Sequence, residues 1–293
     1  MEYETFKNNI ISIYGDEGRK WLDDLSKSVN EFAQRWHLSS LEPVKNLSYN
    51  YVLSGFQGVQ PIVLKLSLDT KGLNIEAAAL KAFKGHGAVD IIDQTDGALL
   101  LERAVPGVSL KEFFPSCDDE AIVIASEAIK KLHSASRINQ KGFPTINDWL
   151  TALDEPCEEL GEKLIKARTL RDELLTTMGD PILLHGDLHH DNILACGNEW
   201  KVIDPKGVIG ELSYEVGCFI RNPLEDLPNN LNSLEIIANR IDDFSRQLNL
   251  DAERILNWCF VQAVLATLWA LEDSVDPTNF KRLTEIFGKL MIG

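Results

Sequence analysis

The chain has 293 residues, 44% of them hydrophobic and 25% charged, and its formal net charge is −16. Such acidity disfavours nucleic acid and anionic membrane as partners, because proteins bind both through Lys and Arg side chains that neutralise phosphates. The first four residues, MEYE, are unlike a secretory signal, no apolar run is long enough to span a bilayer, and the five cysteines form no C-x-x-C pair. We therefore expect a cytoplasmic protein with reduced thiols and one large or two modest domains.

The first third of the chain combines one helical stretch with several β-like ones. Apolar side chains recur every three or four positions over residues 21–36, which predicts a helix with a single buried stripe. Residues 41–68 contain short β-like runs separated by Gly and Pro, as in a meander. Two further strands are expected at residues 89–93 and 98–103, and the break at Pro106-Gly107 is the expected hinge between two lobes.

Lys65 and Glu76 occupy informative positions in this region. Alternation along residues 61–66 places Lys65 on the strand face opposite the Ile and Leu side chains. A lysine there either solubilises an edge strand or binds a phosphate group. Glu76 begins a good helical stretch over residues 76–83 and shares a face with its apolar residues, so it can point inward and pair with Lys65.

Helical patterning dominates the rest of the chain. It covers residues 118–135, 143–178, 231–248 and 252–271. Asp118 or Asp119 would cap the first of these helices. Residues 105–293 carry 18 Lys and Arg against 31 Asp and Glu, compared with 11 against 14 in residues 1–104. An acidic second lobe would attract a polycationic substrate, although cytoplasmic proteins are often acidic for solubility alone.

The most informative motif is LHGDLHHDNIL at residues 184–194, followed by VIDPKG at residues 202–207. In the kinase layout, an Asp of the catalytic loop accepts the proton of the attacking hydroxyl, and an Asn five residues later holds a magnesium ion. An Asp on the next hairpin holds the metals that bridge the nucleotide phosphates. Asp187, Asn192 and Asp204 occupy these positions. The motif predicts phosphoryl transfer from ATP with Mg²⁺, with Asp187 as catalytic residue and Asn192 and Asp204 as metal ligands.

Two other interpretations of this motif are open. The His and Asp side chains of residues 185–191 could ligate a transition metal such as zinc. Gly186 and the flanking strand-like runs argue against the regular helix that would place His185 and His189 on one face. A solvated polar loop without chemistry is the second alternative, but it does not explain why Asp204 arrives where a metal-binding hairpin requires it.

The chain resembles the aminoglycoside and hydroxyurea phosphotransferases, a branch of the kinase-like small-molecule phosphotransferases that includes streptomycin 6-kinases. The residues that carry the resemblance are IVLKL at 62–66, LLLER at 99–103, PGVSL at 106–110, the catalytic loop, IDPKGVIG at 203–210, Tyr214, RNP at 221–223 and AVLATLWALED at 263–273. The resemblance implies an α+β fold of the bilobal protein-kinase type. Residues 1–104 would form a small nucleotide-binding lobe with an antiparallel sheet, and residues 105–293 a larger, mostly helical lobe for catalysis and acceptor binding.

The resemblance also assigns residues to the nucleotide. It places the adenine against the linker, where the backbone of Glu102 and Ala104 would recognise it, and gives Lys65 and Glu76 the role of the kinase strand-lysine and helix-glutamate pair. The phosphate-covering loop should lie near residues 45–50, which contain no glycine. The Ser48 hydroxyl is therefore expected to substitute as a donor to a phosphate.

Glu215 stands where the family is expected to have an aspartate. The extra methylene puts in doubt whether this carboxylate braces the catalytic loop. Gly186 replaces the arginine with which protein kinases sense phosphorylation of their activation loop, so control by phosphorylation is not expected.

The resemblance leads to a substrate as well. We expect transfer to a hydroxyl of a small cationic molecule, an aminoglycoside of the streptomycin type, with antibiotic resistance as the result. Three acidic pairs flank elements expected near the cleft: Asp154 with Glu155, Glu225 with Asp226, and Glu272 with Asp273. The last pair is the first choice for binding guanidinium or ammonium groups, and the alternative is that it forms a solvated helix end. The alternatives are a metabolite kinase of the same fold, of choline, homoserine or fructosamine type, and a non-catalytic nucleotide-binding module.

Overall fold

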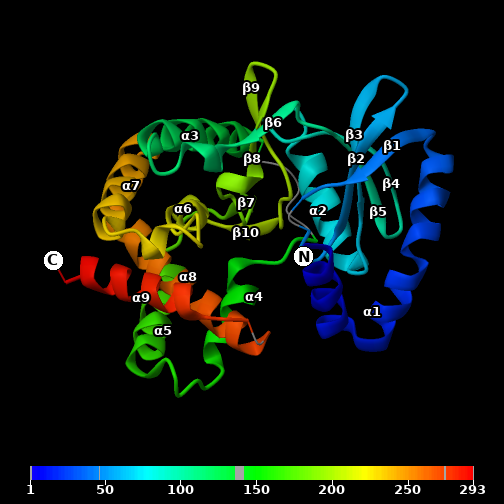
Figure 1. Cartoon of the computed structure of the whole chain (residues 1–293). Coiled ribbons are helices and arrows are strands. Elements are labelled where there is room, and N and C mark those ends of the chain that lie inside the picture. Colours follow the sequence, from blue (N-terminus) through cyan, green and yellow to red (C-terminus); the bar gives the residue numbers. More distant parts are fainter. Residues whose placement is uncertain (1, 46, 136–141, 274, 293) are drawn as a thin grey trace.

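The computed structural model describes residues 2–45, 47–135, 142–273 and 275–292. It has two lobes, a smaller one built on a β-sheet and a larger one that is mostly helical (Figure 1). The α+β, bilobal, protein-kinase-like fold that the sequence predicts is confirmed.

The smaller lobe contains one antiparallel sheet and two helices. Its elements are α1 (Glu2–Arg35), β1 (Leu38–Pro43), β2 (Tyr51–Gln57), β3 (Gln60–Leu66), α2 (Thr70–Ala82), β4 (Ile91–Thr95) and β5 (Ala98–Glu102). The strand order is β1-β2-β3-β5-β4, with every neighbouring pair antiparallel. The predicted meander is therefore present. The strand expected at residues 89–93 is displaced by two residues, because Val89 instead donates its N–H to the carbonyl of Val202 in the other lobe.

The two helices cover opposite faces of this sheet (Figure 1). Ile62, Leu64 and Leu66 of β3 belong to a core that they share with Phe6 of α1, whereas Val63 packs against the core that includes α2. The predicted alternation along β3 is confirmed, and it places Lys65 on the side of α2. The helical region α1 begins well before the stripe at residues 21–36, and a kink at Gly15 divides it into two helical segments. The first segment buries its own apolar group, which includes Phe6.

The larger lobe contains three short strand pairs and seven α-helices among the residues that the structure describes. Its elements are β6 (Pro106–Ser109), η1 (Leu110–Phe113), α3 (Asp118–Ser134), α4 (Ile146–Leu150), η2 (Thr151–Asp154), α5 (Gly161–Thr176), β7 (Ile182–Leu184), η3 (His190–Asn192), β8 (Ile193–Cys196), β9 (Glu199–Val202), β10 (Val208–Gly210), α6 (Leu212–Ile220), η4 (Leu227–Asn229), α7 (Ser233–Leu248), α8 (Ala252–Glu272) and α9 (Thr278–Leu290). The pairs are β6 with β8, β8 with β9, and β7 with β10.

Pro106 begins strand β6 and pairs with Cys196 of β8, and residues 103–105 join this strand to β5. The hinge at Pro106-Gly107 and the boundary after residue 104 stay predictions. One other expectation for this part of the chain is wrong. Neither Asp118 nor Asp119 caps α3: the N-cap is Cys117, without a side-chain bond, and Asp118 is engaged by Arg240.

Helix α8 forms the centre of the larger lobe and contacts α5, α6, α7 and α9. The expectation that no apolar run is long enough to span a bilayer is wrong, because in the described part of the chain this one helix has the length and apolar composition to do so. Inside the protein, 67% of its most apolar window is buried. Burial on nearly all sides explains why its sequence is apolar all round.

Candidate active site

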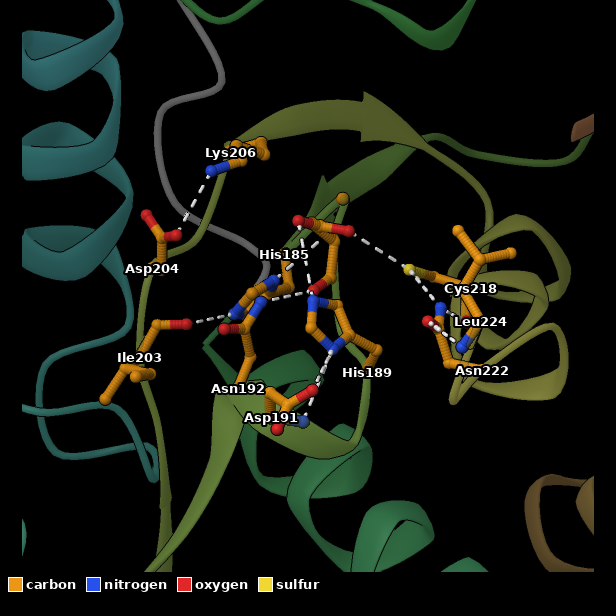
Figure 2. A network of polar contacts seen from close by, with 12 residues as sticks. His185, His189, Asp191, Asn192, Ile203, Asp204, Lys206, Cys218, Asn222 and Leu224 are labelled. Atoms are coloured by element: carbon orange, nitrogen blue, oxygen red, sulfur yellow. Dashed lines mark hydrogen bonds and ion pairs between the residues drawn. The ribbon is translucent and has the colours of Figure 1, made fainter. Parts of the chain in front are cut away.

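The predicted catalytic loop follows β7 and leads through η3 into β8, and the predicted metal-binding hairpin follows β9 (Figure 2). The two segments are joined by backbone hydrogen bonds. The N–H of Ile203 donates to the carbonyl of Asn192 at 3.0 Å, and the carbonyl of His185 accepts from the N–H groups of Lys206 at 2.8 Å and Gly207 at 3.1 Å. These bonds fix the loop and the hairpin relative to one another.

His185 is fully buried and ties these segments together by its side chain. Burial lowers its pKa to about 4, so the ring is neutral at pH 7. Nε2 lies 2.9 Å from the carbonyl oxygen of Ile203, and Nδ1 accepts the N–H of Asp187 at 3.3 Å. Both ring nitrogens are thus engaged, which argues against His185 as a zinc ligand. Within the described ranges, no group of three or more His, Cys, Asp or Glu is placed to hold a metal ion.

Glu215 of α6 braces the catalytic loop. Its carboxylate accepts the N–H of His185 at 2.6 Å on one oxygen and the N–H of Gly186 at 3.0 Å on the other. The doubt raised by a glutamate at this position is therefore resolved: the longer side chain reaches both backbone groups. Burial raises its pKa to about 7, although the two backbone hydrogen bonds lower it.

Asn192 has an orientation that suits a metal ligand. Its Nδ2 donates to the carbonyl oxygen of Asp187 at 2.8 Å, which directs the amide oxygen away from that carbonyl. The Asn192 side chain is itself buried. An oxygen held in this way has the chemistry that Mg²⁺ prefers.

Asp204 lies between two lysines. Lys65 Nζ is 2.6 Å from Asp204 Oδ1 and 2.6 Å from Glu76 Oε2, and Lys206 Nζ is 3.2 Å from Asp204 Oδ2. The predicted contact between Lys65 and Glu76 is present. Burial on its own would lower the pKa of Lys65, but the carboxylates of Glu76 and Asp204 raise it well above its usual value.

The backbone of Asp204 is in an unusual conformation, with φ of 59°. A residue that precedes a proline normally adopts extended backbone, and residues other than glycine rarely have positive φ. Such strain persists where the surroundings over-determine a conformation and is common at functional sites. Here the backbone hydrogen bonds of Ile203 and Lys206, one residue before and two residues after Asp204, hold the hairpin to the catalytic loop.

Gly186 shows why this loop has no arginine at the position used by protein kinases. Its φ is +82°, and a Cβ atom would lie 2.9 Å from the ring of Trp149 and 2.9 Å from Val208. Only glycine fits, because both the backbone conformation and the space exclude a side chain.

The residues predicted for the nucleotide come from the sheet of the smaller lobe, the loop before β2 and the linker. Both carboxylate oxygens of Glu102 lie 2.6 Å from Lys201 Nζ, and one accepts the N–H of Asp90. Ala104 is buried, and within the described residues its backbone makes no hydrogen bond to protein, which leaves it available to an adenine. Ser48 is exposed, and its carbonyl accepts from Asn9 of α1 at 3.2 Å. Asn46 of the same predicted loop lies outside the described residues.

A cavity of about 290 Å³ opens beside Gly186. Its lining consists of Tyr49, Trp149, Gly186, Tyr214, Glu215, Cys218, Arg221, Gln262, Leu265, Ala266, Trp269, Ala270, Asp273, Val275 and Phe280. Aromatic side chains from both lobes contribute, since Tyr49 comes from the loop between β1 and β2. The cavity therefore adjoins the catalytic loop and the predicted phosphate-covering loop together.

The structure separates the predicted acidic pairs. Asp273 lines the cavity, but Glu272 does not. Glu225 and Asp226 are exposed outside it, and Asp226 Oδ2 is 3.9 Å from Lys111 Nζ. Asp154 is engaged by Arg171 at 2.6 Å, and the carbonyls of Asp154 and Glu155 accept from Arg168. The expectation that all three pairs lie at the cleft is wrong, because two of them serve contacts elsewhere.

Two residues of the site had no role in the sequence-based prediction. Cys218 Sγ donates to Asp187 Oδ1 at 3.2 Å, and Arg221 lines the cavity next to it. The signal was present in the sequence, because Tyr214, Cys218 and Arg221 follow one another at helical spacing and so share one face of α6.

Comparison with known proteins bears on what this site does. The chain is 27% identical over 249 residues to streptomycin 3''-kinase of Klebsiella pneumoniae, which covers 82% of this chain and 91% of that protein. It is 26% identical over 281 residues to streptomycin 6-kinase of Streptomyces glaucescens, which covers 90% of each. Among solved structures, amicoumacin kinase hAmiN in complex with AMP-PNP and Ca²⁺ superposes with a TM-score of 0.72 at 14% identity, over 91% of this chain and 94% of that one.

The family described as aminoglycoside/hydroxyurea antibiotic resistance kinase matches residues 35–274. That range includes Lys65, the catalytic loop, the metal-binding hairpin and all of α8. On this evidence the chain belongs to the aminoglycoside/hydroxyurea antibiotic resistance kinase family and is a phosphotransferase.

Proposed function

We propose that this enzyme transfers the γ-phosphate of ATP, with Mg²⁺, to a hydroxyl of a small cationic molecule, an aminoglycoside of the streptomycin type, and so confers resistance. The single observation that carries the chemistry is the placement of Lys65 between Glu76 and Asp204, at 2.6 Å from each. A strand lysine paired with a helix glutamate, close to an aspartate of the metal hairpin, is the combination of residues that kinases use for phosphoryl transfer.

The residues at the proposed metal site fit a magnesium ion. Asp204 supplies a carboxylate and Asn192 an amide oxygen, and hard cations prefer oxygen ligands. A bound Mg²⁺ would neutralise charge on the β- and γ-phosphates. Lys65 and Lys206 now compensate the charge of Asp204, and they would turn to phosphate oxygens when nucleotide binds.

Asp187 has the position of the residue that orients the acceptor. Its Oδ1 is held by Cys218, and its carbonyl is held by Asn192. The acceptor hydroxyl would therefore meet Oδ2 and pass its proton to this oxygen as the phosphoryl group arrives. Transfer then depends mainly on positioning and on charge neutralisation.

The acceptor would occupy the cavity beside Gly186. Support for a cationic acceptor comes from Asp273 and the aromatic rings of Trp149, Trp269 and Tyr49 in its lining, since aromatic faces attract cations. The two streptomycin kinases to which the chain is similar are named for different hydroxyls. A cytoplasmic location, where ATP is available, is part of the proposal.

The proposal is tested by incubating the purified protein with ATP and Mg²⁺ and a panel of acceptors, and by measuring ADP release and phosphorylated product. The panel contains streptomycin, hydroxyurea, choline and homoserine. Phosphorylation of streptomycin with the highest kcat/KM supports the proposal. Turnover of a neutral or metabolic alcohol instead would overturn the substrate assignment, and no turnover with any acceptor, despite nucleotide binding, would favour a non-catalytic module.

A further inference from the structure

Arg221 is the one basic side chain among the described residues that line the cavity beside Gly186, which we call the acceptor cavity. It follows helix α6 directly and is half-buried. Neither the family resemblance nor the proposed chemistry gives this side chain a task. A guanidinium in the wall of an acceptor site carries five N–H donors and no acceptor, so it selects for oxygen-bearing groups.

Helix α6 brings Arg221 close to the reacting centre. Tyr214, Cys218 and Arg221 line the same cavity, as their spacing of four and three residues along the helix requires. Cys218 in turn donates from Sγ to Asp187 Oδ1 at 3.2 Å. Side chains three apart on a helix have Cβ atoms about 5–6 Å apart, so Arg221 lies next to the side chain that touches the catalytic carboxylate.

Among the described residues, one hydrogen bond holds the guanidinium in place. Its Nη1 donates to Gln262 Oε1 at 2.8 Å. Gln262 is buried, and its own Nε2 donates to the carbonyl of Tyr214 at 2.7 Å. The amide of Gln262 is thereby fixed with its oxygen toward Arg221. This contact orients the guanidinium and leaves its remaining N–H groups available to a ligand.

Two other arginines of this lobe pair with carboxylates. Arg240 pairs with Asp118 at 2.6 Å, and Arg254 pairs with Glu211 at 2.8 Å. Among the residues that the structure describes, Arg221 forms no ion pair, and its guanidinium contacts Gln262 instead. A half-buried cation in the wall of a cavity, with N–H groups left for a ligand, indicates a group that arrives with the substrate.

We propose that Arg221 is a specificity residue of the acceptor site and binds an oxygen of the acceptor that lies next to the hydroxyl to be phosphorylated. The bound group is a hydrogen-bond acceptor, such as a carbonyl, ether or neighbouring hydroxyl oxygen. The inference rests on the proposed phosphotransferase function and adds a requirement to it. An acceptor needs a second oxygen near its reactive hydroxyl, in addition to any cationic group.

The charged residues of the cavity support separate binding places for a cationic group and for an oxygen atom of the acceptor. Asp273 supplies a carboxylate at the end of α8, whereas Glu215 uses both of its oxygens on the catalytic loop. A substrate would thus place a cationic group toward Asp273 and oxygen-rich groups toward Arg221 and Asp187. Opposite charges at two places in one cavity fix the orientation of a substrate as well as its affinity.

The test compares acceptors that differ in the second oxygen. Streptomycin carries oxygens beside each hydroxyl, hydroxyurea carries a carbonyl next to its hydroxylamine group, and choline has a single hydroxyl and no other oxygen. Binding of each compound to the ADP-bound enzyme is measured by calorimetry for the wild type, Arg221→Met and Arg221→Lys. We expect Arg221→Met to weaken the binding of streptomycin and of hydroxyurea about ten- to a hundredfold, which is the effect of losing a hydrogen bond to a charged group. Any affinity for choline and the affinity for ADP should change less than about twofold.

Asp273→Asn serves as the matched control at the other place in the cavity. This variant should bind the cationic compounds, streptomycin and choline, more weakly and should bind hydroxyurea as the wild type does. The assignment of Arg221 is overturned if Arg221→Met binds both oxygen-bearing compounds like the wild type, if it weakens choline equally, or if the wild type binds neither oxygen-bearing compound. If streptomycin is not phosphorylated while hydroxyurea binding still depends on Arg221, the aminoglycoside proposal fails and the role of Arg221 stands.

Discussion

Lys65 Nζ lies 2.6 Å from Asp204 Oδ1, although 139 residues separate the two in the chain. One side chain comes from the sheet of the smaller lobe and the other from the hairpin after β9 in the larger lobe. The charge of each is thus compensated by a residue of the other lobe. A substitution at either position should therefore affect residues of both lobes at the cleft.

Replacing Asp204 by alanine should abolish Mg²⁺-dependent nucleotide binding. The substitution removes the carboxylate proposed as metal ligand and leaves Lys65 and Lys206 without a shared anion. Calorimetric titration with an ATP analogue, with and without Mg²⁺, measures the effect. Asp191→Ala is the matched control, because Asp191 is an exposed carboxylate of the neighbouring loop. An Asp204 variant whose nucleotide affinity still rises with Mg²⁺ would refute the metal assignment.

Lys65 and Glu76 should behave as one unit in a double-mutant cycle. Lys65→Met and Glu76→Gln should each slow phosphoryl transfer, and the double variant should lose far less than the sum of the two, because residues in direct contact are not independent. The kcat/KM values of the four proteins give the coupling free energy. Additive losses would show that the buried 2.6 Å contact has no part in the reaction.

Asp187→Ala should reduce kcat by about two to four orders of magnitude, the usual contribution of a general base. The affinity for ATP should stay within about twofold of the wild-type value, because in the proposed mechanism Asp187 contacts the acceptor hydroxyl and not the nucleotide. Steady-state kinetics with saturating acceptor and a separate nucleotide titration measure the two quantities. If more than about a tenth of turnover survives, Asp187 is not the base.

Much of the site could be predicted from local sequence, because its parts are short and their spacing is fixed by backbone geometry. Asp187, Asn192 and Asp204 lie in one pair of hairpin-like segments whose apolar flanks read as strands. Alternation along β3 places Lys65 on the α2 side, where Glu76 meets it at 2.6 Å. In each case the pattern of buried residues determines where the polar side chain points.

The cavity proposed for the acceptor could not be predicted in the same way. Its lining joins Tyr49, Trp149 and Arg221 with residues of α8, and only the tertiary fold brings these segments together. The acidic pairs could not be distinguished in the sequence. In the structure Asp154 forms an ion pair with Arg171, whereas Asp273 lines the cavity. Charge alone does not reveal whether a carboxylate meets a ligand or an arginine of the same protein.

Arg240 should be essential for stability. It is fully buried, and its guanidinium pairs with Asp118 and donates to the carbonyls of Phe219, Ile220 and Asn222. Arg240→Met should cost about 3–5 kcal/mol, because removing one partner leaves a buried carboxylate unpaired. Urea denaturation measures this loss. The double variant Arg240→Met with Asp118→Leu should regain part of it, and a single variant as stable as the wild type would show that this network contributes nothing.

Glu215 should make the stability of the protein depend on pH in an identifiable way. Burial raises its pKa to about 7 from an ordinary 4.5, so the folded state holds the proton more tightly than the unfolded state does. This contribution is fully present below pH 4.5 and is lost as the pH rises through about 7. Its size is on the order of 3 kcal/mol.

Glu215→Gln resembles the protonated acid and cannot titrate. Urea unfolding of both proteins between pH 5 and 8.5 should therefore show a free energy of unfolding that falls with pH more steeply in the wild type than in the variant. Glu235→Gln, a change at an exposed glutamate of α7, should keep the wild-type slope. Equal slopes in the wild type and Glu215→Gln would mean that the carboxylate stays ionised on its two backbone N–H donors over the whole range, with the hydrogen bonds outweighing burial.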